Sequence, residues 1–272
     1  MQARPTSLSP AAIAEAAELL VDLRRRHTER IAELPPSCRP ADLADGYAIQ
    51  DEVVRRLCEE HGGQRIGWKV ACTNALAQQA LQVDHPMFGQ LLSHSTSTSP
   101  VVLHAAEFTT RVIECEFGLR IGRTVPVSDL PYTAMTIVDH VSDVLPAIEV
   151  VDHRFADWSL GAPSIAADNA IHGWWVHGSP FQGDWHTLDL ATHPLEARID
   201  GELVGDGTGA AVLGHPLNVL AWLANELPRY GHRLVEGDLV TTGVCTDVFT
   251  ADPPSTVVAD FGSLGTVSVH WA

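Results

Sequence analysis

The stretch Arg111-Val112-Ile113-Glu114-Cys115-Glu116-Phe117-Gly118-Leu119-Arg120-Ile121 decides the fold class of this 272-residue chain. It is rich in β-branched, aromatic and other apolar residues, which is typical of a β-strand. Glu114 and Glu116 stand two positions apart, so a strand places both carboxylates on the same face. The stretch therefore indicates a β-sheet with a candidate functional site on it.

Further β-prone runs dominate the chain after residue 64. They lie at residues 66–70, 145–151, 173–176, 195–204, 238–242 and 256–271. Asp200-Gly201 within one of these runs predicts a hairpin turn. Only two helices are expected among the strands, over residues 128–143 and 216–227. This order does not fit a regular βαβ alternation.

Residues 9–60 are expected to be mostly helical. Ser9-Pro10 provides an N-cap and a favourable first helical residue, and apolar residues then recur at helical spacing. A second helix is expected from Ala41 to about Glu60, where Gly62-Gly63 stops it. Arg24-Arg25-Arg26 is expected to be a solvated last turn, because the helix dipole favours cations there.

We therefore predict an α+β fold with a mixed β-sheet core, rolled or barrel-like, and a helical N-terminal arm. Residues 1–63 would form the helical region and residues 64–272 the mixed-β catalytic domain. The Ser/Thr-rich run at residues 93–99 is expected to be a surface loop.

Composition excludes several classes of protein. The 17 basic and 34 acidic residues give a net charge of −17, which repels the phosphate backbone of nucleic acid. No run approaches the roughly 18 apolar residues that a membrane span needs. The five cysteines form no C-x-x-C pair, and the N-terminus has no apolar run typical of a signal peptide. We expect reduced thiols and a cytoplasmic protein.

A third carboxylate, Glu149, lies in the apolar run Leu145-Pro146-Ala147-Ile148-Glu149-Val150-Val151. Burying a glutamate is costly unless the carboxylate is paired or binds a metal. Three carboxylates without cysteine or histidine at matching spacing favour Mg²⁺ or Mn²⁺ over zinc. The alternative is that Glu114 and Glu116 face solvent and that Glu149 pairs with an arginine such as Arg154.

Three other segments each allow two interpretations. Lys69, in the apolar run Gly67-Trp68-Lys69-Val70, lies on a strand edge or wet face, or else balances an anionic substrate or transfers a proton. Asp84 heads a turn at residues 83–89 and is most simply a turn cap. Asp168-Asn169 is most simply part of a turn as well.

These segments, taken in order along nearly the whole chain, match the pattern of one family. The matching segments are residues 45–50, 67–70, 83–89, 114–116, 145–150 with Arg154, 167–170, 214–217, 222–225, 237–238 and 264–267. The chain resembles the fumarylacetoacetate hydrolase superfamily, in the branch of the 2-keto-4-pentenoate hydratases and 4-oxalocrotonate decarboxylases. The resemblance implies a fumarylacetoacetase C-terminal-like fold.

The resemblance also implies a set of site residues and a divalent cation, Mg²⁺ or Mn²⁺. The implied residues are Glu114, Glu116 and Glu149 for the metal, Lys69 and Asp84 for catalysis, and Asp168, Asn169 and Thr246 for substrate binding. The chain departs from the family pattern at Ala71-Cys72-Thr73-Asn74, at the loop Thr242-Gly243-Val244-Cys245-Thr246, and at the bulky His172 and Trp174-Trp175. These departures bear on the substrate rather than on the metal.

The activity implied by the resemblance is that of a metal-dependent hydratase in the catabolism of aromatic compounds. Such an enzyme adds water to a small anionic 2-hydroxy-2,4-dienoate and gives a 4-hydroxy-2-oxo acid. The alternatives are a 4-oxalocrotonate-type decarboxylase, an acylpyruvate-type C–C hydrolase with His172 or His153 as base, and a catalytically silent assembly subunit. Otherwise these histidines are expected to be structural. The expected partners are further copies of the chain and a pathway partner enzyme.

Overall fold

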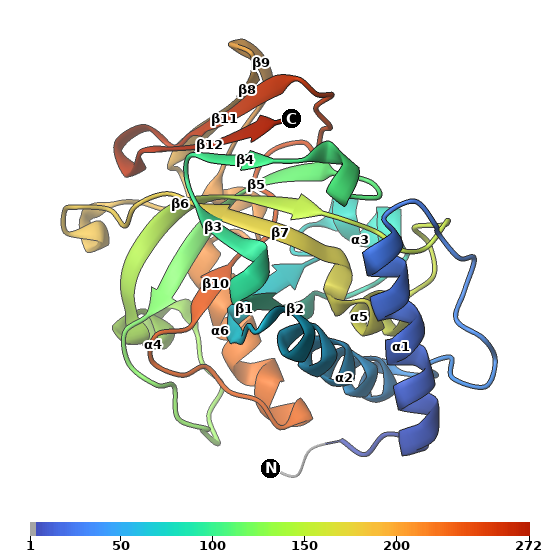
Figure 1. The fold of residues 1–272 in the computed structure, drawn as a ribbon. Coiled ribbons are helices and arrows are strands. Elements are labelled where there is room, and N and C mark those ends of the chain that lie inside the picture. The colour runs from blue at the N-terminus through green and yellow to red at the C-terminus, as the bar shows by residue number, and fades with distance from the viewer. Residues whose placement is uncertain (1–3) are drawn as a thin grey trace.

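Two β-sheets organise the chain in the computed structural model, which describes residues 4–272 (Figure 1). The larger sheet contains β1 (Arg65–Ala71), β2 (Met87–Leu92), β3 (Thr96–Thr98), β5 (Val112–Ile121), β6 (Val141–Val151), β7 (His172–His177) and β10 (Leu239–Thr241). Its strand order is β2-β1-β10-β5-β6-β7-β3. The smaller sheet contains β4 (Val101–Leu103), β8 (Pro194–Ile199), β9 (Glu202–Thr208), β11 (Ser255–Asp260) and β12 (Thr266–Trp271). Its order is β4-β12-β11-β8-β9.

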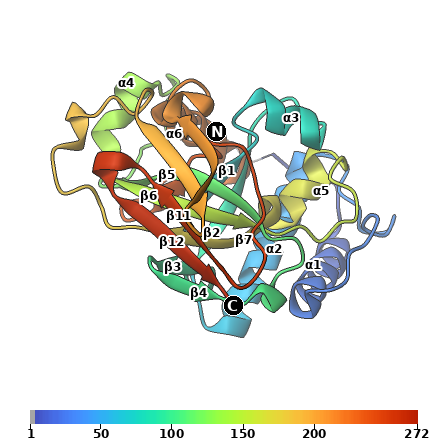
Figure 2. The ribbon, with the colours of Figure 1, turned by 90° about the horizontal axis from the view of Figure 1, so that it is seen from above.

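Helices cover the larger sheet on two sides. They are α1 (Pro10–Arg26), α2 (Leu43–His61), α3 (Ala75–Leu81), α4 (Ala134–Ile137), α5 (Ala162–Ala167) and α6 (Pro216–Glu226). Seen from above, α1, α2 and α5 lie on one side of the strands, and α4 and α6 lie on the other (Figure 2). The curved mixed sheet with N-terminal helices confirms the predicted α+β fold. No helix within residues 4–272 is both long and apolar enough to cross a membrane.

The two N-terminal helices begin and end as their cap residues dictate. Ser9 caps α1 by accepting from the Ala12 N–H, and Gly62 ends α2 in the left-handed conformation. Apolar side chains of both helices pack in one buried cluster with Leu92 and Phe155. The helical arm is therefore fixed to the sheet. Its division from the rest of the chain into two domains stays a prediction.

Most predicted strands are confirmed within a few residues, as is the hairpin at Asp200-Gly201, which joins β8 and β9. The run at residues 256–271 forms two strands, β11 and β12. The surface loop predicted at residues 93–99 is wrong in part, because β3 pairs in parallel with β7.

The helix predicted over residues 128–143 is wrong. Pro131 disfavours helical backbone at the residue before it, so a helix starts only after the cap residue Thr133 and spans Ala134–Ile137. Residues from Val141 onward belong to β6 instead, where Val141 and Val144 are buried in the core of the sheet. Pairing with β5 thus overrides the local helical pattern.

Asp45 in α2 ties down the segment that precedes α1, and its loss is expected to destabilise the chain. Burial alone would raise the pKa of this carboxyl, but hydrogen bonds from Thr6, Ser7 and the Ala41 N–H lower it to about 2. A carboxyl whose pKa is lower in the folded than in the unfolded state stabilises the fold at pH values above the unfolded-state pKa. This stabilisation is lost as the pH falls through the folded-state pKa.

We expect Asp45→Asn to lower the free energy of unfolding by about 2 kcal/mol at pH 7. The difference from the unsubstituted protein should shrink between about pH 4 and pH 2, because the Asp45 carboxyl then becomes uncharged in the unfolded and the folded state in turn. Urea unfolding at several pH values measures this. A difference that stays constant down to about pH 2 contradicts the role assigned to Asp45.

Candidate metal centre

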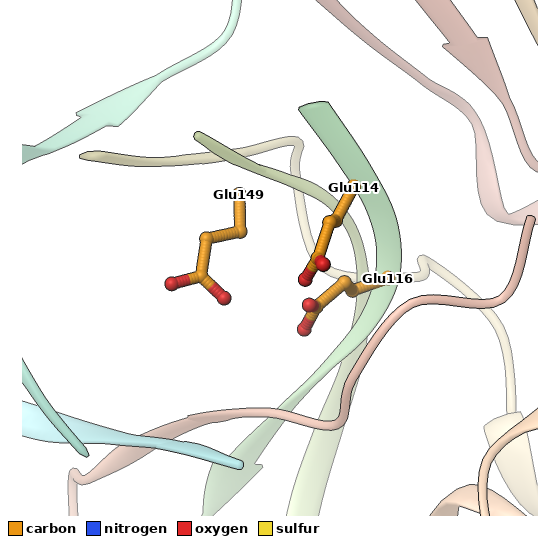
Figure 3. Close-up of side chains that lie close together, drawn as sticks. All are labelled: Glu114, Glu116 and Glu149. Atoms are coloured by element: carbon orange, nitrogen blue, oxygen red, sulfur yellow. The ribbon is translucent and has the colours of Figure 1, made fainter. Parts of the chain in front are cut away.

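Three glutamates from neighbouring strands point at one another on the larger sheet (Figure 3). Glu114 on β5 stands directly opposite Glu149 on β6, and Glu116 follows two positions after Glu114 on the same face. One carboxylate oxygen from each residue lies within 4.8 Å of the others. The strand period and the antiparallel register therefore bring together the three residues that the resemblance implied as metal ligands.

Hydrogen bonds orient these carboxylates but leave some of their oxygens free. Glu116 Oε2 accepts from the Gly243 N–H at 2.8 Å and from the Thr241 hydroxyl. Within residues 4–272, Glu116 Oε1 and Glu149 Oε2 are buried and have no hydrogen-bond partner. A buried carboxylate oxygen without a donor is costly, so the cluster is suited to a cation.

Lys69 completes the cluster from β1. Its side chain is 1% exposed, and its ammonium lies 3.3 Å from Glu149 Oε1 and donates to the Ala170 carbonyl at 2.9 Å. In a flat sheet β1 would lie about 14 Å from β6, because three inter-strand spacings separate them. The curl of the sheet and the length of the lysine side chain close this gap. An exposed or edge position for Lys69, the alternative left open by its sequence, is wrong.

Burial and mutual repulsion raise the pKa of the carboxyls. For Glu114 burial is the main cause, followed by the charges of Glu116 and Glu149, and its pKa lies well above the ordinary value. Burial, and then the charge of Glu149, raises the pKa of Glu116 to about 8. Burial also raises the pKa of Glu149, although Lys69 opposes this shift.

For the pKa of Lys69, the neighbouring charges outweigh the effect of burial. Burial alone would lower its pKa, but the three carboxylates outweigh burial and raise it. The ammonium supplies one positive charge against three negative ones. A divalent cation would bring the cluster to neutrality, and oxygen-only donors suit Mg²⁺ or Mn²⁺. The residues present therefore fit such an ion.

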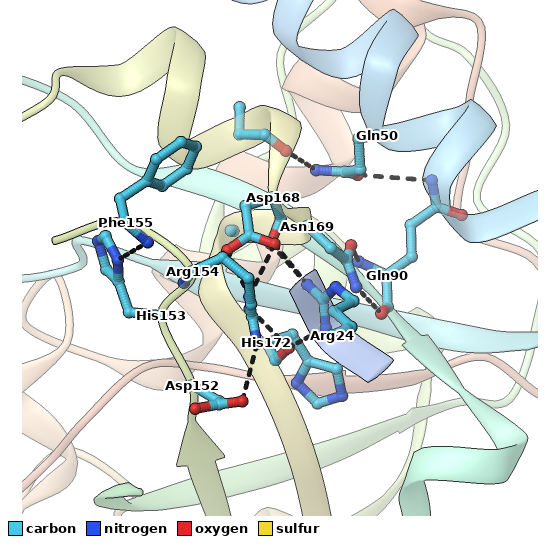
Figure 4. Close-up of polar contacts among 12 residues, drawn as sticks. Arg24, Gln50, Gln90, Asp152, His153, Arg154, Phe155, Asp168, Asn169 and His172 are labelled. Carbon is cyan, nitrogen blue, oxygen red and sulfur yellow. Dashed lines mark hydrogen bonds and ion pairs between the residues drawn. The ribbon is translucent and has the colours of Figure 1, made fainter. Parts of the chain in front are cut away.

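Arginines near the cluster are paired elsewhere (Figure 4). Arg154 bonds Asp168 at 2.8 Å and Asp152 at 2.9 Å. The alternative pairing of Glu149 with Arg154 is therefore wrong, and so is a solvent-facing Glu116, which is fully buried. Arg24 also bonds Asp168, at 2.9 Å, so the expectation of a solvated last turn in α1 is wrong for this arginine.

Asp168 and Asn169 are engaged by the protein itself. Both oxygens of Asp168 accept from arginines. The Asn169 side chain accepts from the Gln90 N–H at 2.7 Å and donates to the Gln90 carbonyl at 2.9 Å, as a neighbouring strand would (Figure 4). Through these bonds both residues hold the turn that follows, and their role in substrate binding stays a prediction.

That turn is strained. Asn169, Ala170 and Ile171 have φ values of 52°, 48° and 57°. For residues other than glycine, such left-handed backbone costs roughly 1–2 kcal/mol each. A Cβ at Gly89 would come within 2.5 Å of the Asn169 carbonyl, so only glycine allows the turn to pack against β2. In this turn the Ala170 carbonyl faces Lys69 and accepts its hydrogen bond. Strand β7 follows directly, starting at His172.

Two predicted site residues, Asp84 and Thr246, make no hydrogen bond with the three glutamates within residues 4–272. Asp84 has a side chain that is 96% exposed and lies 3.6 Å from His85. The half-buried Thr246 donates to the Asp247 carbonyl. The structure does not bring either side chain into hydrogen-bond contact with the three glutamates among residues 4–272. Their roles in catalysis and substrate binding stay predictions.

Two groups on the cluster were not identified from the sequence, the Thr241 hydroxyl and the Gly243 N–H, and His172 was named only as a candidate base of the C–C hydrolase alternative. His172 Nδ1 lies 2.8 Å from Glu149 Oε1, although 23 positions separate the two residues and no motif links them. One composition signal does point to this site. Lys69 is the only lysine among the 17 basic residues, and the other 16 are arginines.

Comparison with known proteins gives consistent matches. The family model described as "Fumarylacetoacetate (FAA) hydrolase C-terminal" matches residues 67–270. A 2-keto-4-pentenoate hydratase from Burkholderia vietnamiensis is 32% identical over 238 residues, which cover 87% of this chain and 89% of the relative. A 4-oxalocrotonate decarboxylase from Pseudomonas putida is 29% identical over 84% of this chain and 85% of its own length.

A solved structure matches nearly the whole fold. It is that of 4-oxalocrotonate decarboxylase from Pseudomonas putida G7 complexed with magnesium and adipate. The TM-score is 0.89 at 25% identity, and the match covers 98% of this chain and all of the other.

Proposed function

This chain belongs to the fumarylacetoacetate hydrolase family, and from that premise we propose that it is a metal-dependent hydratase. It adds water to a 2-hydroxy-2,4-dienoate of the 2-oxo-4-pentenoate type and releases a 4-hydroxy-2-oxo acid. The observation that carries the proposal is the buried cluster of Glu114, Glu116, Glu149 and Lys69. The 2-keto-4-pentenoate hydratases similar to this chain support the reaction class.

The three glutamates would hold Mg²⁺, with Mn²⁺ as the other candidate. Their unpartnered oxygens within the described chain, Glu116 Oε1 and Glu149 Oε2, are suited to that role. When bound, the cation would stabilise negative charge that develops on the 2-oxygen of the substrate. Asp168, Asn169 and the strained turn keep the surrounding backbone in place.

Lys69 provides a fixed positive charge for an anionic substrate. An ammonium has three N–H donors, and Ala170 and Glu149 engage two of them. The third can donate to a substrate oxygen. In the proposed reaction the dienol first ketonises by proton transfer to C5, and water then adds at C4 of the conjugated enone. Lys69 and Asp84 are the candidates for moving protons in the first step.

Proton NMR of 2-hydroxypenta-2,4-dienoate mixed with the protein tests the proposal. We expect signals of 4-hydroxy-2-oxopentanoate in Mg²⁺, and a rate at least about 100-fold lower after treatment with EDTA, since Lewis-acid stabilisation is worth several kcal/mol. A folded protein that gives no such product in Mg²⁺ contradicts the hydratase. Equal rates in Mg²⁺ and EDTA contradict the metal's role.

A second candidate is a 4-oxalocrotonate-type decarboxylase, which the high structural similarity to such an enzyme favours. The same stabilised enolate would form by loss of CO₂ when a carboxylate is attached to the γ-carbon of the conjugated ketone. Release of CO₂ from 2-oxohex-3-enedioate, without turnover of the pentadienoate, would favour this reaction.

Self-association is also part of the proposal. The side chains of Val127, Leu130 and Met135 are large, apolar and exposed, the last by 84%. Exposed apolar side chains close together in the sequence support the expectation of a homo-oligomer.

A further inference from the structure

The stretch Gly205-Asp206-Gly207-Thr208-Gly209 has glycines at three alternate positions, and the proposed function uses none of them. It covers the end of β9 and the turn that follows. β9 is an edge strand of the smaller sheet and pairs with β8 (Figure 1). None of the three glycines has a positive φ, so backbone conformation does not explain them. A glycine in a strand also allows another backbone to approach closely.

The backbone that approaches β9 belongs to the loop from Thr242 to Thr246. A Cβ at Gly207 would come within 1.8 Å of the Cys245 carbonyl oxygen, far inside van der Waals contact. Gly205 lies on the same face of the strand and is less crowded, because its Cβ would lie 3.4 Å from the Thr246 Cβ. Of these two glycines, only Gly207 must lack a side chain for β9 and the loop to pack as they do.

The same loop reaches the candidate metal centre. The Cys245 N–H donates to the Cys115 carbonyl at 2.9 Å, which ties the loop to β5 between Glu114 and Glu116. Two positions before Cys245, the Gly243 N–H donates to Glu116 Oε2 at 2.8 Å. The loop therefore contacts β9 at one residue and a candidate metal ligand two residues away.

A second close contact restricts the loop at Gly243. This glycine has a φ of 97°, and a Cβ there would lie 2.0 Å from the Thr73 hydroxyl oxygen. The loop backbone thus packs directly on the segment that follows β1. Only Val244 separates Gly243 from Cys245, so little chain is present to absorb a displacement of Cys245 before it reaches the Gly243 N–H.

We propose that Gly207 is a positioning residue for Glu116. Because Gly207 has no side chain, β9 packs on the Cys245 carbonyl, and the loop places the Gly243 N–H on Glu116 Oε2. The other oxygen, Oε1, has no hydrogen-bond partner within residues 4–272 and remains for the cation. The inference rests on the metal-dependent function proposed above and gives β9 a part in it.

The test compares Gly207→Ala with Gly205→Ala and Gly209→Ala by isothermal titration of Mg²⁺. We expect the dissociation constant of Gly207→Ala to rise about 10-fold to 100-fold, as is typical when a residue that orients a metal ligand is changed. Gly205→Ala, which makes an ordinary contact on the same face, should bind Mg²⁺ nearly as the unsubstituted protein does.

Gly209→Ala is the control for strain. Its Cβ would lie 2.1 Å from the Leu190 carbonyl oxygen, so the clash is of the same kind but does not involve the loop. We expect urea unfolding in EDTA to show a loss of stability similar to that of Gly207→Ala, with nearly unchanged Mg²⁺ affinity. An equal loss of affinity in Gly209→Ala would overturn the inference, because general strain would then explain the effect.

Unchanged Mg²⁺ affinity in a folded Gly207→Ala would also overturn the inference. In both cases Mg²⁺ binding by the unsubstituted protein would leave the proposed function standing. Absence of Mg²⁺ binding by the unsubstituted protein would contradict the role of the metal in the proposed function, and the inference with it.

Hydrogen exchange of the unsubstituted protein decides the matter if Gly207→Ala does not fold. Coupling between two sites is reciprocal, so a strand that favours Mg²⁺ binding is itself stabilised by Mg²⁺. We expect Mg²⁺ to slow exchange in residues 202–208 as well as in residues 241–246, and to affect β4, at the other edge of the same sheet, much less. Slowing confined to residues 241–246 would overturn the inference, and so would equal slowing in β4.

Discussion

Glu114→Gln is expected to remove Mg²⁺ binding and, at the same time, to stabilise the metal-free protein. Burial and two neighbouring carboxylates raise the pKa of Glu114 well above its ordinary value. A carboxyl with a raised pKa destabilises the fold at pH 7, and an amide of the same shape removes that cost. We expect the free energy of unfolding in EDTA to rise by about 1–3 kcal/mol.

With Mg²⁺ present, the stability advantage of Glu114→Gln over the unsubstituted protein should largely disappear. The unsubstituted protein gains about 2.7 kcal/mol when Mg²⁺ is at about 100 times its dissociation constant. The variant loses a ligand, so we expect its affinity to fall more than about 100-fold, beyond the usual effect of residues that only orient ligands. Hydration of the dienoate should fall about 1000-fold.

Calorimetry in EDTA and in Mg²⁺, with isothermal titration of Mg²⁺, measures both effects. Glu202→Gln is a suitable control, because it makes the same change of charge at an exposed position on β9. We expect it to alter neither stability nor binding appreciably. Loss of stability of Glu114→Gln in EDTA would contradict the repulsion described for the cluster. Undiminished Mg²⁺ affinity would contradict the assignment of Glu114 as a ligand.

Lys69→Met is expected to abolish turnover while preserving or strengthening Mg²⁺ binding. The ammonium faces Glu149, and the three carboxylates raise its pKa against the effect of burial. Its removal takes away repulsion toward a bound divalent cation, so affinity should not fall. Loss of the charge that we propose holds the substrate and moves a proton should lower the hydration rate about 1000-fold.

The metal-free Lys69→Met variant should be destabilised by about 3 kcal/mol, because three buried carboxylates then lack their counter-charge. Mg²⁺ should restore much of this loss. Lys69→Arg tests whether charge alone suffices, and we expect it to restore stability but little activity, since a planar guanidinium does not fit the position of a compact ammonium. Full activity of Lys69→Met would exclude Lys69 from the reaction.

Because Lys69 is the only lysine in the sequence, a label on lysine side chains reports on this residue alone. Reductive methylation with ¹³C-formaldehyde labels amines, so a sample labelled while denatured and then refolded carries one lysine signal. Movement of that signal on addition of Mg²⁺ would report the contact between Lys69 and the glutamates. The signal should be missing from Lys69→Met, which identifies it.

Local sequence determined the elements and part of the site. Ser9, Asp42 and Gly62 fix helix ends through contacts with residues a few positions away, and Asp200-Gly201 fixes a hairpin in the same way. The two-residue period of a strand placed Glu114 and Glu116 on one face. Such features could be predicted because each depends on neighbours in the chain.

The partners of the buried charges were decided by tertiary structure alone. Glu149 faces Glu114 because of the register between β5 and β6, and Lys69 reaches Glu149 because the sheet curls. Arg24 is mostly buried and binds Asp168, whereas Asp84 is exposed. No local pattern specifies these outcomes, because each depends on strand order and on packing between segments far apart in sequence.

The bond between His172 and Glu149 is the clearest case. The sequence determined that the chain carries Glu114, Glu116, Glu149 and Lys69, the residues that its family resemblance implies for the metal and for catalysis. Only the fold decided which nitrogen of which histidine meets a carboxylate. A ring's tautomer depends on the atoms around it, and the atom that bonds the His172 ring, Glu149 Oε1, comes from β6.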